Sequence, residues 1–411
     1  MSEVYRGRSD VIPDLIEDIF LRLPLKSILK FKTVSKQWRS ILESRSFVES
    51  RMKVQKKPKI LAAGDHRSQS LFREGDTEEI DIVYINSRDA ATRPSLTCDG
   101  LVCIPVPGWV NVLNPSTGEF VSFPSGPDPV TNHYDDNLIF TETWWNIFPA
   151  YWAMGVGRDK VSGSYKVVRM FFDPIPYCEI LDVDIGEWRE VKPPPYKVEP
   201  RRKPAFVNGS LYWIEMIKSD NVFALDLHTE EFRDVVPFPP TCAVADQLVN
   251  LEDRLAIVTA YTKPWEFEIR VLDEQEETWS LVYSISLANS GVFSRRQRSV
   301  WFRPVAVSNS GNLFFHDNER RLFKYYPETD QVVCLSSDIC VVSDFVENLV
   351  SLRPRTSSVY RSGFHYQDHV PGSPKRQMFS WIKLRIPNVL LATTLVSSII
   401  IFRYFAGSSR S

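Results

Sequence analysis

The chain has few cysteines and histidines, and those it has do not form the arrangements that bind metals. Its six cysteines are scattered, none belongs to a CxxC pair, and no histidine partners them at zinc-ligand spacing. The first ten residues, MSEVYRGRSD, lack the apolar run of a secretory signal peptide. We therefore expect free thiols in a reducing compartment, the cytoplasm, the nucleus or both, and we interpret the sequon Asn208-Gly209-Ser210 as a turn.

Sequence motifs of catalysis and cofactor binding are also missing. The chain has no GxSxG motif and no Cys–His arrangement or paired carboxylate motif that stands out. The two glycines of GVGRDK (155–160) complete neither GxGxxG nor a Walker motif, which favours a loop there. His365 and His369 are four residues apart but lack the glutamate of a zinc helix. We predict no metal site, no cofactor and no enzymatic activity of the chain itself.

Neither sign of charge predominates over the 411 residues. With 49 Lys and Arg against 51 Asp and Glu, the formal net charge is −2, so we predict no nucleic-acid partner. The two ends depart from this balance. Residues 1–57 hold 13 basic and 7 acidic residues, and residues 355–411 hold 8 basic residues and the single acidic residue Asp368.

Three short amphipathic helices are predicted between residues 12 and 42. Pro13 suits the first turn of a helix, apolar residues follow at helical spacing, and Pro24 ends the first helix and opens the second. A third run places Val34 and Trp38 on one face. Helices this short bury too little surface for independent stability. They form either an apolar groove for a partner or a cap on the chain's own β domain.

From residue 58 onward the apolar periodicity becomes alternating, and two short signatures recur. In the first, Asp or Asn is followed, after five intervening residues, by an aromatic residue; its copies are NPSTGEF (114–120), DVDIGEW (182–188), DLHTEEF (226–232) and DEQEETW (273–279). We expect the acidic or amide side chain to bond its own backbone in a turn and the aromatic residue to begin a strand. The second signature is a tight turn between paired strands, as in CDGLVCI (98–104) and NGSLYWI (208–214).

The spacing of the second signature indicates repeated blades. Its turn positions are 63, 46, 44 and 58 residues apart; they are Gly100, Gly163, Gly209, Asp253 and Gly311. A period near 45 residues is that of a four-stranded propeller blade. Both ends of the chain supply segments that would complete one more blade: 59–63, 70–72, 80–85, 339–345 and 348–352. We predict a small all-α module followed by an all-β propeller of about six blades.

The helical segment closely resembles an F-box, particularly the plant type. The resemblance rests on Ile12-Pro13, Leu15, Ile19, Leu23, Leu25, Leu29, Val34-Ser35-Lys36, Trp38, Ile41 and Phe47. It implies that residues 1–56 bind a Skp-type adaptor, which bridges to a cullin-RING ubiquitin ligase. The implied adaptor contacts are Pro13, Leu15, Ile16, Ile19, Leu23, Leu25, Leu29, Val34, Lys36, Trp38 and Ile41. Some of these residues must instead form the core of the module, and the sequence does not fully sort them.

The β region, residues 57–353, resembles the F-box-associated domains of plant F-box proteins, with kelch-like repeats. The resemblance rests on GVGRDKVSGSYKVVRMF (155–171) and on the ending ENLVSL (347–352). It implies a non-catalytic substrate-recognition subunit of a Skp–cullin–F-box ligase, whose propeller binds a target protein. The alternative from the residues alone is a β-propeller scaffold or ligand-binding protein with a helical cap and no ligase role.

One aromatic-rich insertion is a candidate target-binding segment. The stretch TETWWNIFPAYW (141–152) contains Trp144, Trp145, Tyr151 and Trp152, and such residues are enriched at the centres of protein interfaces. The same side chains would also suit the core of a blade.

The chain beyond residue 353 divides into a basic flexible linker (354–386) and a hydrophobic tail (387–405). No charge occurs from Val389 to Phe402, which is fourteen residues, and the run is seventeen residues long when counted from Ile386. A membrane span needs roughly twenty. Three interpretations stay open: a C-terminal hydrophobic helix that anchors the chain at the cytosolic face of a membrane, an interfacial or partner-bound strand, and a segment folded on the propeller.

Overall fold

The computed structural model describes most of the chain between residues 13 and 354. The described ranges are 13–54, 57–63, 79–85, 95–106, 109–124, 153–172, 176–198, 203–215, 221–235, 246–262, 265–273, 275, 277–288 and 301–354. The chain forms two compact units, Met1–Phe379 and Ser380–Ser411. Every described residue belongs to the first unit.

Four helices open the described chain, one more than the three predicted. They are α1 (Pro13–Leu21), α2 (Leu25–Phe31), α3 (Lys36–Leu42) and α4 (Arg45–Lys53). Ser35 caps α3 by accepting a hydrogen bond from the backbone N–H of Trp38, and Ser44 caps α4 by accepting one from the backbone N–H of Phe47. The helical prediction stopped at Leu42, although the second cap is a usable signal for α4.

The four helices share one small core, which we call the module core. Phe20, Ile28, Leu42, Phe47 and Val48 are buried in it, together with Leu349 from the far end of the chain. Phe20 is also the centre of an aromatic cluster, with its ring centroid 5.2 Å from that of Trp38 and 6.5 Å from that of Phe47. A residue more than 300 positions away in the sequence therefore completes the packing of the helices.

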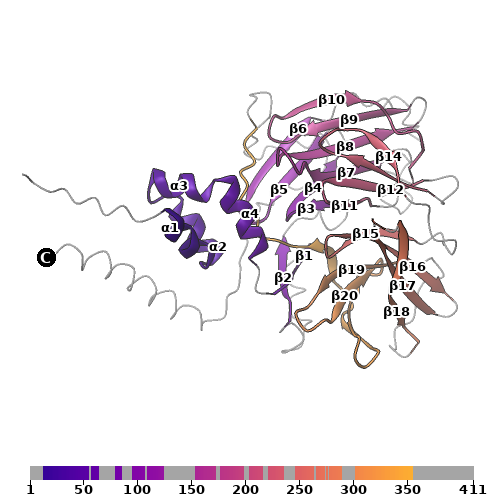
Figure 1. Ribbon diagram of the computed structural model, residues 1–411. Coiled ribbons are helices and arrows are strands. Elements are labelled where there is room, and N and C mark those ends of the chain that lie inside the picture. Colours follow the sequence, from indigo (N-terminus) through magenta and orange to yellow (C-terminus); the bar gives the residue numbers. More distant parts are fainter. Residues whose placement is uncertain are drawn as a thin grey trace, which may run out of the picture. The chain divides into compact units, whose positions relative to one another are not determined.

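Five antiparallel sheets of four strands follow, each a meander (Figure 1). Blade 1 contains β3 (Leu96–Cys98), β4 (Leu101–Val106), β5 (Trp109–Asn114) and β6 (Glu119–Pro124). Blade 2 contains β7 (Ala153–Arg158), β8 (Tyr165–Phe171), β9 (Tyr177–Asp182) and β10 (Glu187–Val191). Blade 3 contains β11 (Ala205–Val207), β12 (Ser210–Ile214), β13 (Val222–Asp226) and β14 (Phe232–Asp234). Blade 4 contains β15 (Gln247–Leu251), β16 (Arg254–Thr262), β17 (Trp265–Asp273) and β18 (Thr278–Ser286), and blade 5 contains β19 (Phe302–Val307), β20 (Leu313–Asp317), β21 (Leu322–Tyr326) and β22 (Gln331–Ser336).

The sixth sheet joins both ends of the propeller and confirms the prediction of six blades. In it, β23 (Cys340–Asp344) pairs antiparallel with β1 (Lys59–Ala63), which pairs in parallel with β2 (Asp81–Ile85). The first strands of the blades contact one another in order, from β3 through β7, β11, β15, β19 and β23 back to β3, so the ring is closed. Residues 348–352 were predicted to join this blade, but they form no strand. Residues 70–72 lie outside the described residues.

Both sequence signatures have the structural roles predicted for them. Asp182 and Asp226 each accept hydrogen bonds from backbone N–H groups two and three residues further on, at 2.8–3.1 Å. The aromatic residue of each signature lies in the next strand, as Trp188 does in β10. In three of the five tight turns two successive residues have positive φ, for example Asp99 (48°) and Gly100 (77°). This is the conformation of the favoured two-residue hairpin turns.

The glycines of GVGRDK were predicted to lie in a loop, and that prediction is wrong. Gly155 and Gly157 lie in strand β7, where the next blade packs directly against the backbone. A Cβ at Gly157 would come within 2.5 Å of Leu227 Cδ1 and 2.6 Å of Phe206 Cδ2. These glycines therefore set how closely blades 2 and 3 pack.

We predict that Gly157→Val lowers the free energy of unfolding by about 1–3 kcal/mol, because the added carbon atoms force apart two packed blades. Urea denaturation of the full chain measures the change. The control is Met154→Val, which shortens a partly buried side chain on the same strand and should cost less. An unchanged denaturation midpoint for Gly157→Val would show that the blades separate freely at this point.

Candidate adaptor-binding surface and its junction with the propeller

Three of the predicted adaptor contacts are apolar side chains that the structure leaves in solvent. Leu15 is 54% exposed, Ile19 is 40% exposed and Val34 is 60% exposed. Leu15 and Ile19 are four residues apart on α1, so they share one face of that helix. A module this small exposes large apolar side chains at a cost in solubility, and such side chains mark a binding surface.

The remaining predicted contacts are divided between the module core and the surface. Six of them are partly buried and pack against the module core: Ile16, Leu23, Leu25, Leu29, Trp38 and Ile41. Lys36 is exposed at the start of α3. The side chain of Pro13 lies outside the described residues. The structure thus separates an exposed set from a core-forming set, which the sequence alone did not do.

The predicted target-binding residues Trp144, Trp145, Tyr151 and Trp152 lie outside the described residues, as do the linker and the hydrophobic tail. No helix within the described part of the chain is both long enough and apolar enough to cross a membrane. Over the same part, no three His, Cys, Asp or Glu side chains are grouped so that they could hold a metal ion. None of the five described cysteines forms a disulfide bond.

A segment directly after β23 connects the helices to the propeller; we call residues 345–352 the strap. Its carboxylate Glu347 pairs with Arg51 of α4 and lies 2.6 Å from Lys59 Nζ at the start of β1. Arg51 is itself buried and donates a second hydrogen bond to the carbonyl of Leu21 at 2.7 Å. Burial raises the pKa of the Glu347 carboxyl, but the hydrogen bonds from Lys59 and Arg51 outweigh burial and hold this pKa below its ordinary value.

Asn348, the next residue of the strap, is fully buried among polar groups of the propeller. Its Nδ2 donates to the carbonyl of Asp99 at 2.9 Å and to the hydroxyl of Tyr165 at 2.8 Å. Its Oδ1 accepts from the backbone N–H of Val350 at 2.9 Å. The strap carbonyl at this position accepts from Asn114 Nδ2 at 3.0 Å. These hydrogen bonds are shielded from solvent, and they fix the strap to blades 1 and 2.

The two leucines of the strap face different cores. Leu349 is buried in the module core, and its carbonyl accepts a hydrogen bond from Lys32 Nζ of the module at 3.5 Å. Leu352 is buried in the core between blades 1 and 2, beside Phe123 and Val156. The strap thus contributes apolar surface to the helical module on one side and to the propeller on the other.

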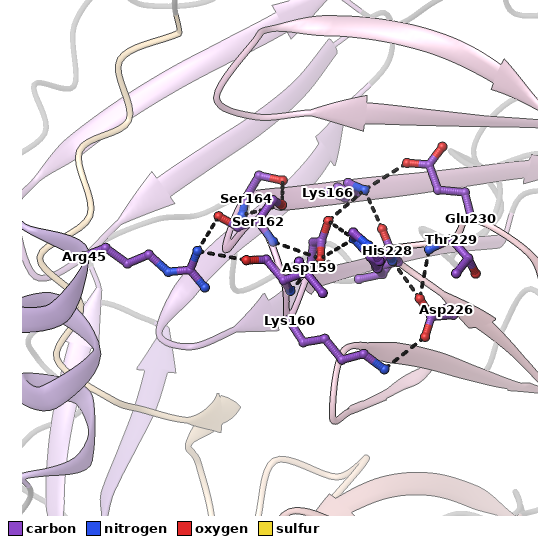
Figure 2. Close-up of polar contacts among 12 residues, drawn as sticks. Arg45, Asp159, Lys160, Ser162, Ser164, Lys166, Asp226, His228, Thr229 and Glu230 are labelled. Atoms are coloured by element: carbon purple, nitrogen blue, oxygen red, sulfur yellow. Dashed lines mark hydrogen bonds and ion pairs between the residues drawn. The ribbon is translucent and has the colours of Figure 1, made fainter.

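A second contact joins α4 to the turn between β7 and β8 (Figure 2). Arg45 Nη1 donates to the carbonyls of Val161 and Ser162 at 2.9 and 2.8 Å. The turn is held in shape by Asp159, whose Oδ1 accepts from the backbone N–H groups of these same two residues. Gly163 has a positive φ of 77°, and a Cβ there would lie 2.8 Å from the Arg45 guanidinium carbon, so glycine suits both the turn and the position of the arginine.

The acidic side chain at the centre of that turn is held ionised by its neighbours. Burial raises the pKa of Asp159, but hydrogen bonds from the turn and from His228 outweigh burial and lower the pKa well below its ordinary value. Lys166 Nζ lies 3.4 Å from Asp159 and 2.8 Å from Glu230. Figure 2 shows Asp159 and Lys166 of blade 2 close to His228 and Glu230 of blade 3. Side chains of both blades therefore hold the turn that contacts Arg45.

We predict that Glu347→Gln lowers the free energy of unfolding by about 2 kcal/mol at pH 7, because buried Arg51 loses its carboxylate partner. The folded-state pKa of Glu347 is depressed, so its contribution is present above its ordinary pKa of 4.5 and is lost as pH falls through the folded value. Urea denaturation of wild type and variant at pH 7, 4 and 3 should show the difference shrinking below about pH 4.5. A difference that is constant across this range would contradict an ionised Glu347.

The sequence carries one signal for this junction, the ending ENLVSL (347–352), but the strand predicted at 348–352 is wrong. This ending carries part of the family resemblance, and its apolar residues suit a strand as well as another extended segment. Leu349 and Leu352 lie in two different cores, and an apolar segment this short does not distinguish that arrangement from a strand. Arg51 and Glu347 are 296 residues apart, and no local pattern pairs them.

The arrangement defines a class of protein: a helical module with an exposed apolar face, attached to a closed six-bladed propeller. The family model of the F-box domain matches residues 9–50, and that of the F-box associated beta propeller domain matches residues 65–328. The chain belongs to the F-box proteins that carry an F-box-associated β-propeller.

Its similarity to curated relatives extends over most of the chain. The F-box/LRR-repeat protein At2g43260 of Arabidopsis thaliana is 49% identical over 363 residues, which is 84% of this chain and 83% of the relative. The F-box/kelch-repeat protein At2g43445 of the same plant is 48% identical over 368 residues, 85% of each chain. The putative F-box protein At4g17780, also from Arabidopsis thaliana, is 46% identical over 368 residues, 85% of this chain and 89% of the relative.

Proposed function

We propose that this protein is the substrate-recognition subunit of a Skp–cullin–F-box ubiquitin ligase. The observation that carries the proposal is the exposed apolar surface of Leu15, Ile19 and Val34 on a module that the F-box family model matches. A Skp-type adaptor that covers these side chains would remove them from water, which favours association. The propeller then binds the target protein.

The proposal extends to the end of the propeller that binds the target. The ends of the first strands of blades 1 and 2 lie side by side: Arg158 Nε, at the last residue of β7, is 2.7 Å from Oδ2 of Asp99, which follows β3. The helical module contacts this same end through Arg45 and Glu49, whose Oε1 lies 3.2 Å from Arg158 Nη1. Because adjacent strands are antiparallel, each connection between blades starts and finishes at the opposite end. We assign target binding to that opposite end.

The proposed mechanism is proximity. A ligase that holds its ubiquitin-charged enzyme near the bound target converts a bimolecular transfer into an effectively intramolecular one. The chain itself supplies binding energy and orientation and no bond-making group, so we propose that it is not an enzyme. Its proposed location is the cytoplasm or nucleus, with attachment to the cytosolic face of a membrane through residues 387–405 as the alternative.

The second candidate is a propeller scaffold with a helical cap, and the junction supports it in one respect. The module core is completed by Leu349, and α4 contacts the propeller, as a cap would. A cap explains the buried side of the module but leaves the exposed face of α1 without a role.

Co-purification distinguishes the two candidates. Full-length protein is co-expressed with a tagged Skp-type adaptor, and the complex is isolated by the adaptor tag and then sized. A stoichiometric complex is expected for the ligase subunit. Absence of a complex, with full-length protein that is monomeric and cooperatively folded, would overturn the ligase proposal and favour the cap.

A further inference from the structure

We propose that the strap makes adaptor binding conditional on a closed propeller: the four helices reach their binding-competent fold only when residues 345–352 are in place. The coupling of the helices to the strap is an inference from the intramolecular contacts. Its consequence for adaptor binding rests on the function proposed above.

The first argument is the composition of the module core. Leu349 shares the module core with five buried side chains of the helices, and a module of about forty residues has a small core to begin with. Removing this buried leucine side chain takes apolar packing out of that core. The helices therefore depend for their packing on a residue that follows the last strand of the propeller.

The second argument is a buried charge. Arg51 of α4 is 8% exposed, and Glu347 is the carboxylate that the described residues place against it. A buried guanidinium stays charged, because it cannot be deprotonated. Loss of its carboxylate partner therefore destabilises the folded state strongly. Glu347 of the strap therefore stabilises α4 in its packed position.

The third argument is that the strap has no fixed position without the propeller. Asn348 takes its partners from the turns of blades 1 and 2, and the backbone N–H of Leu352 donates to Glu119 Oε2 of blade 1 at 2.9 Å. The strap also begins directly at Phe345, whose backbone N–H donates to the carbonyl of Lys59 at 2.8 Å as β23 closes the sixth blade. Placement of the strap therefore requires that the ring has closed.

These three dependencies form a sequence of conditions. The ring closes through β23 and β1, closure places the strap, and the strap completes the core and charge balance of the helices. The helices lie at the start of the chain and the strap lies near its end, so an incomplete chain has an F-box sequence without its support. A receptor with an unfinished target-binding domain would in this way fail to engage the ligase.

A matched pair of variants in the full-length protein tests the coupling. Leu349→Ala removes apolar surface from the module core, and Leu352→Ala makes the same change on the propeller side of the strap. Amide hydrogen exchange of α1–α4 is measured without adaptor, and adaptor affinity is measured separately. We expect Leu349→Ala to speed exchange in the four helices at least ten-fold and to weaken adaptor binding at least ten-fold. Leu352→Ala should instead speed exchange in blades 1 and 2, with a smaller effect on the helices.

The outcomes separate this inference from the proposed function. Wild-type exchange in α1–α4 of Leu349→Ala would overturn the coupling, whatever the adaptor does. Faster exchange in these helices, with no adaptor binding by wild type, would support the coupling and overturn the proposed function. Should Leu349→Ala fail to accumulate as folded protein, Glu347→Gln provides the same comparison, since it leaves the module core intact and removes only the carboxylate that pairs with Arg51 and Lys59.

Discussion

Replacing Leu15 and Ile19 together by Asp is expected to abolish capture of a Skp-type adaptor while leaving the chain folded. Both side chains are already largely in solvent, so the folded state loses little when they become charged. An adaptor that covers this face would have to bury two unpaired carboxylates, which costs several kcal/mol and lowers affinity at least 100-fold. Isothermal titration of purified protein with adaptor measures the loss.

A matched control is available on the propeller. Leu281 is 53% exposed in β18 of blade 4, outside the helical module and its junction, so Leu281→Asp should bind the adaptor as wild type does. Leu23→Asp and Trp38→Ala, by contrast, alter residues packed against the module core, and they would reduce binding by unfolding the helices. Normal binding by the Leu15→Asp, Ile19→Asp protein would show that the adaptor uses a different face.

Asn348→Leu is expected to cause the largest loss of stability of any single substitution at the junction. Leucine has the same branched shape and the same number of heavy atoms but leaves the carbonyl of Asp99, the hydroxyl of Tyr165 and the backbone N–H of Val350 without the hydrogen bonds that the asparagine makes. Each buried group left unsatisfied costs about 1–3 kcal/mol, so we expect a total loss of about 3–5 kcal/mol in the free energy of unfolding. Thermal and urea denaturation of the full chain measure it.

Asn250→Leu is the control for this substitution. Asn250 is exposed and donates to the carbonyl of Phe206 at 2.9 Å in blade 3, so its replacement should cost about 1 kcal/mol or less. Similar losses for the two variants would show that the hydrogen bonds of the strap carry no special weight, because buried and exposed asparagines would then contribute equally.

Local chemistry accounts for the parts of the fold that were predicted correctly. Asp182 and Asp226 shape their turns through hydrogen bonds to N–H groups two and three residues away, and Asp99 with Gly100 forms a two-residue hairpin. Such interactions repeat with the blade, so their spacing disclosed the repeat and the approximate number of blades. The ring closure by β1 and β23 followed because exposed sheet edges are unfavourable.

The errors share a different cause. The loop prediction for Gly157 is wrong because the residues that require glycine there, Phe206 and Leu227, are not its neighbours in the sequence; they occupy the space where a side chain would be. The prediction of a strand at 348–352 is wrong because short apolar segments occur both in strands and in other extended segments. In both cases the deciding contact comes from another part of the chain.

The candidate site shows the same division. The residue types and spacing of the F-box pattern identified the helices and the set of candidate contacts. They did not separate exposed Leu15 and Ile19 from Leu23 and Trp38, which pack in the core, because all four are apolar at helical spacing.

The sequence by itself determined the helical module, the blade repeat, the turn chemistry and the family. These depend on interactions between residues that are close in the chain and on patterns that recur along it. Only the tertiary structure decided which face of the helices is exposed, how tightly blades 2 and 3 pack, and that Glu347, Asn348 and Leu349 support the F-box. Burial and ion pairing depend on which distant segments share a core, and the closed ring brings Leu349 to helices that were made more than 290 residues earlier.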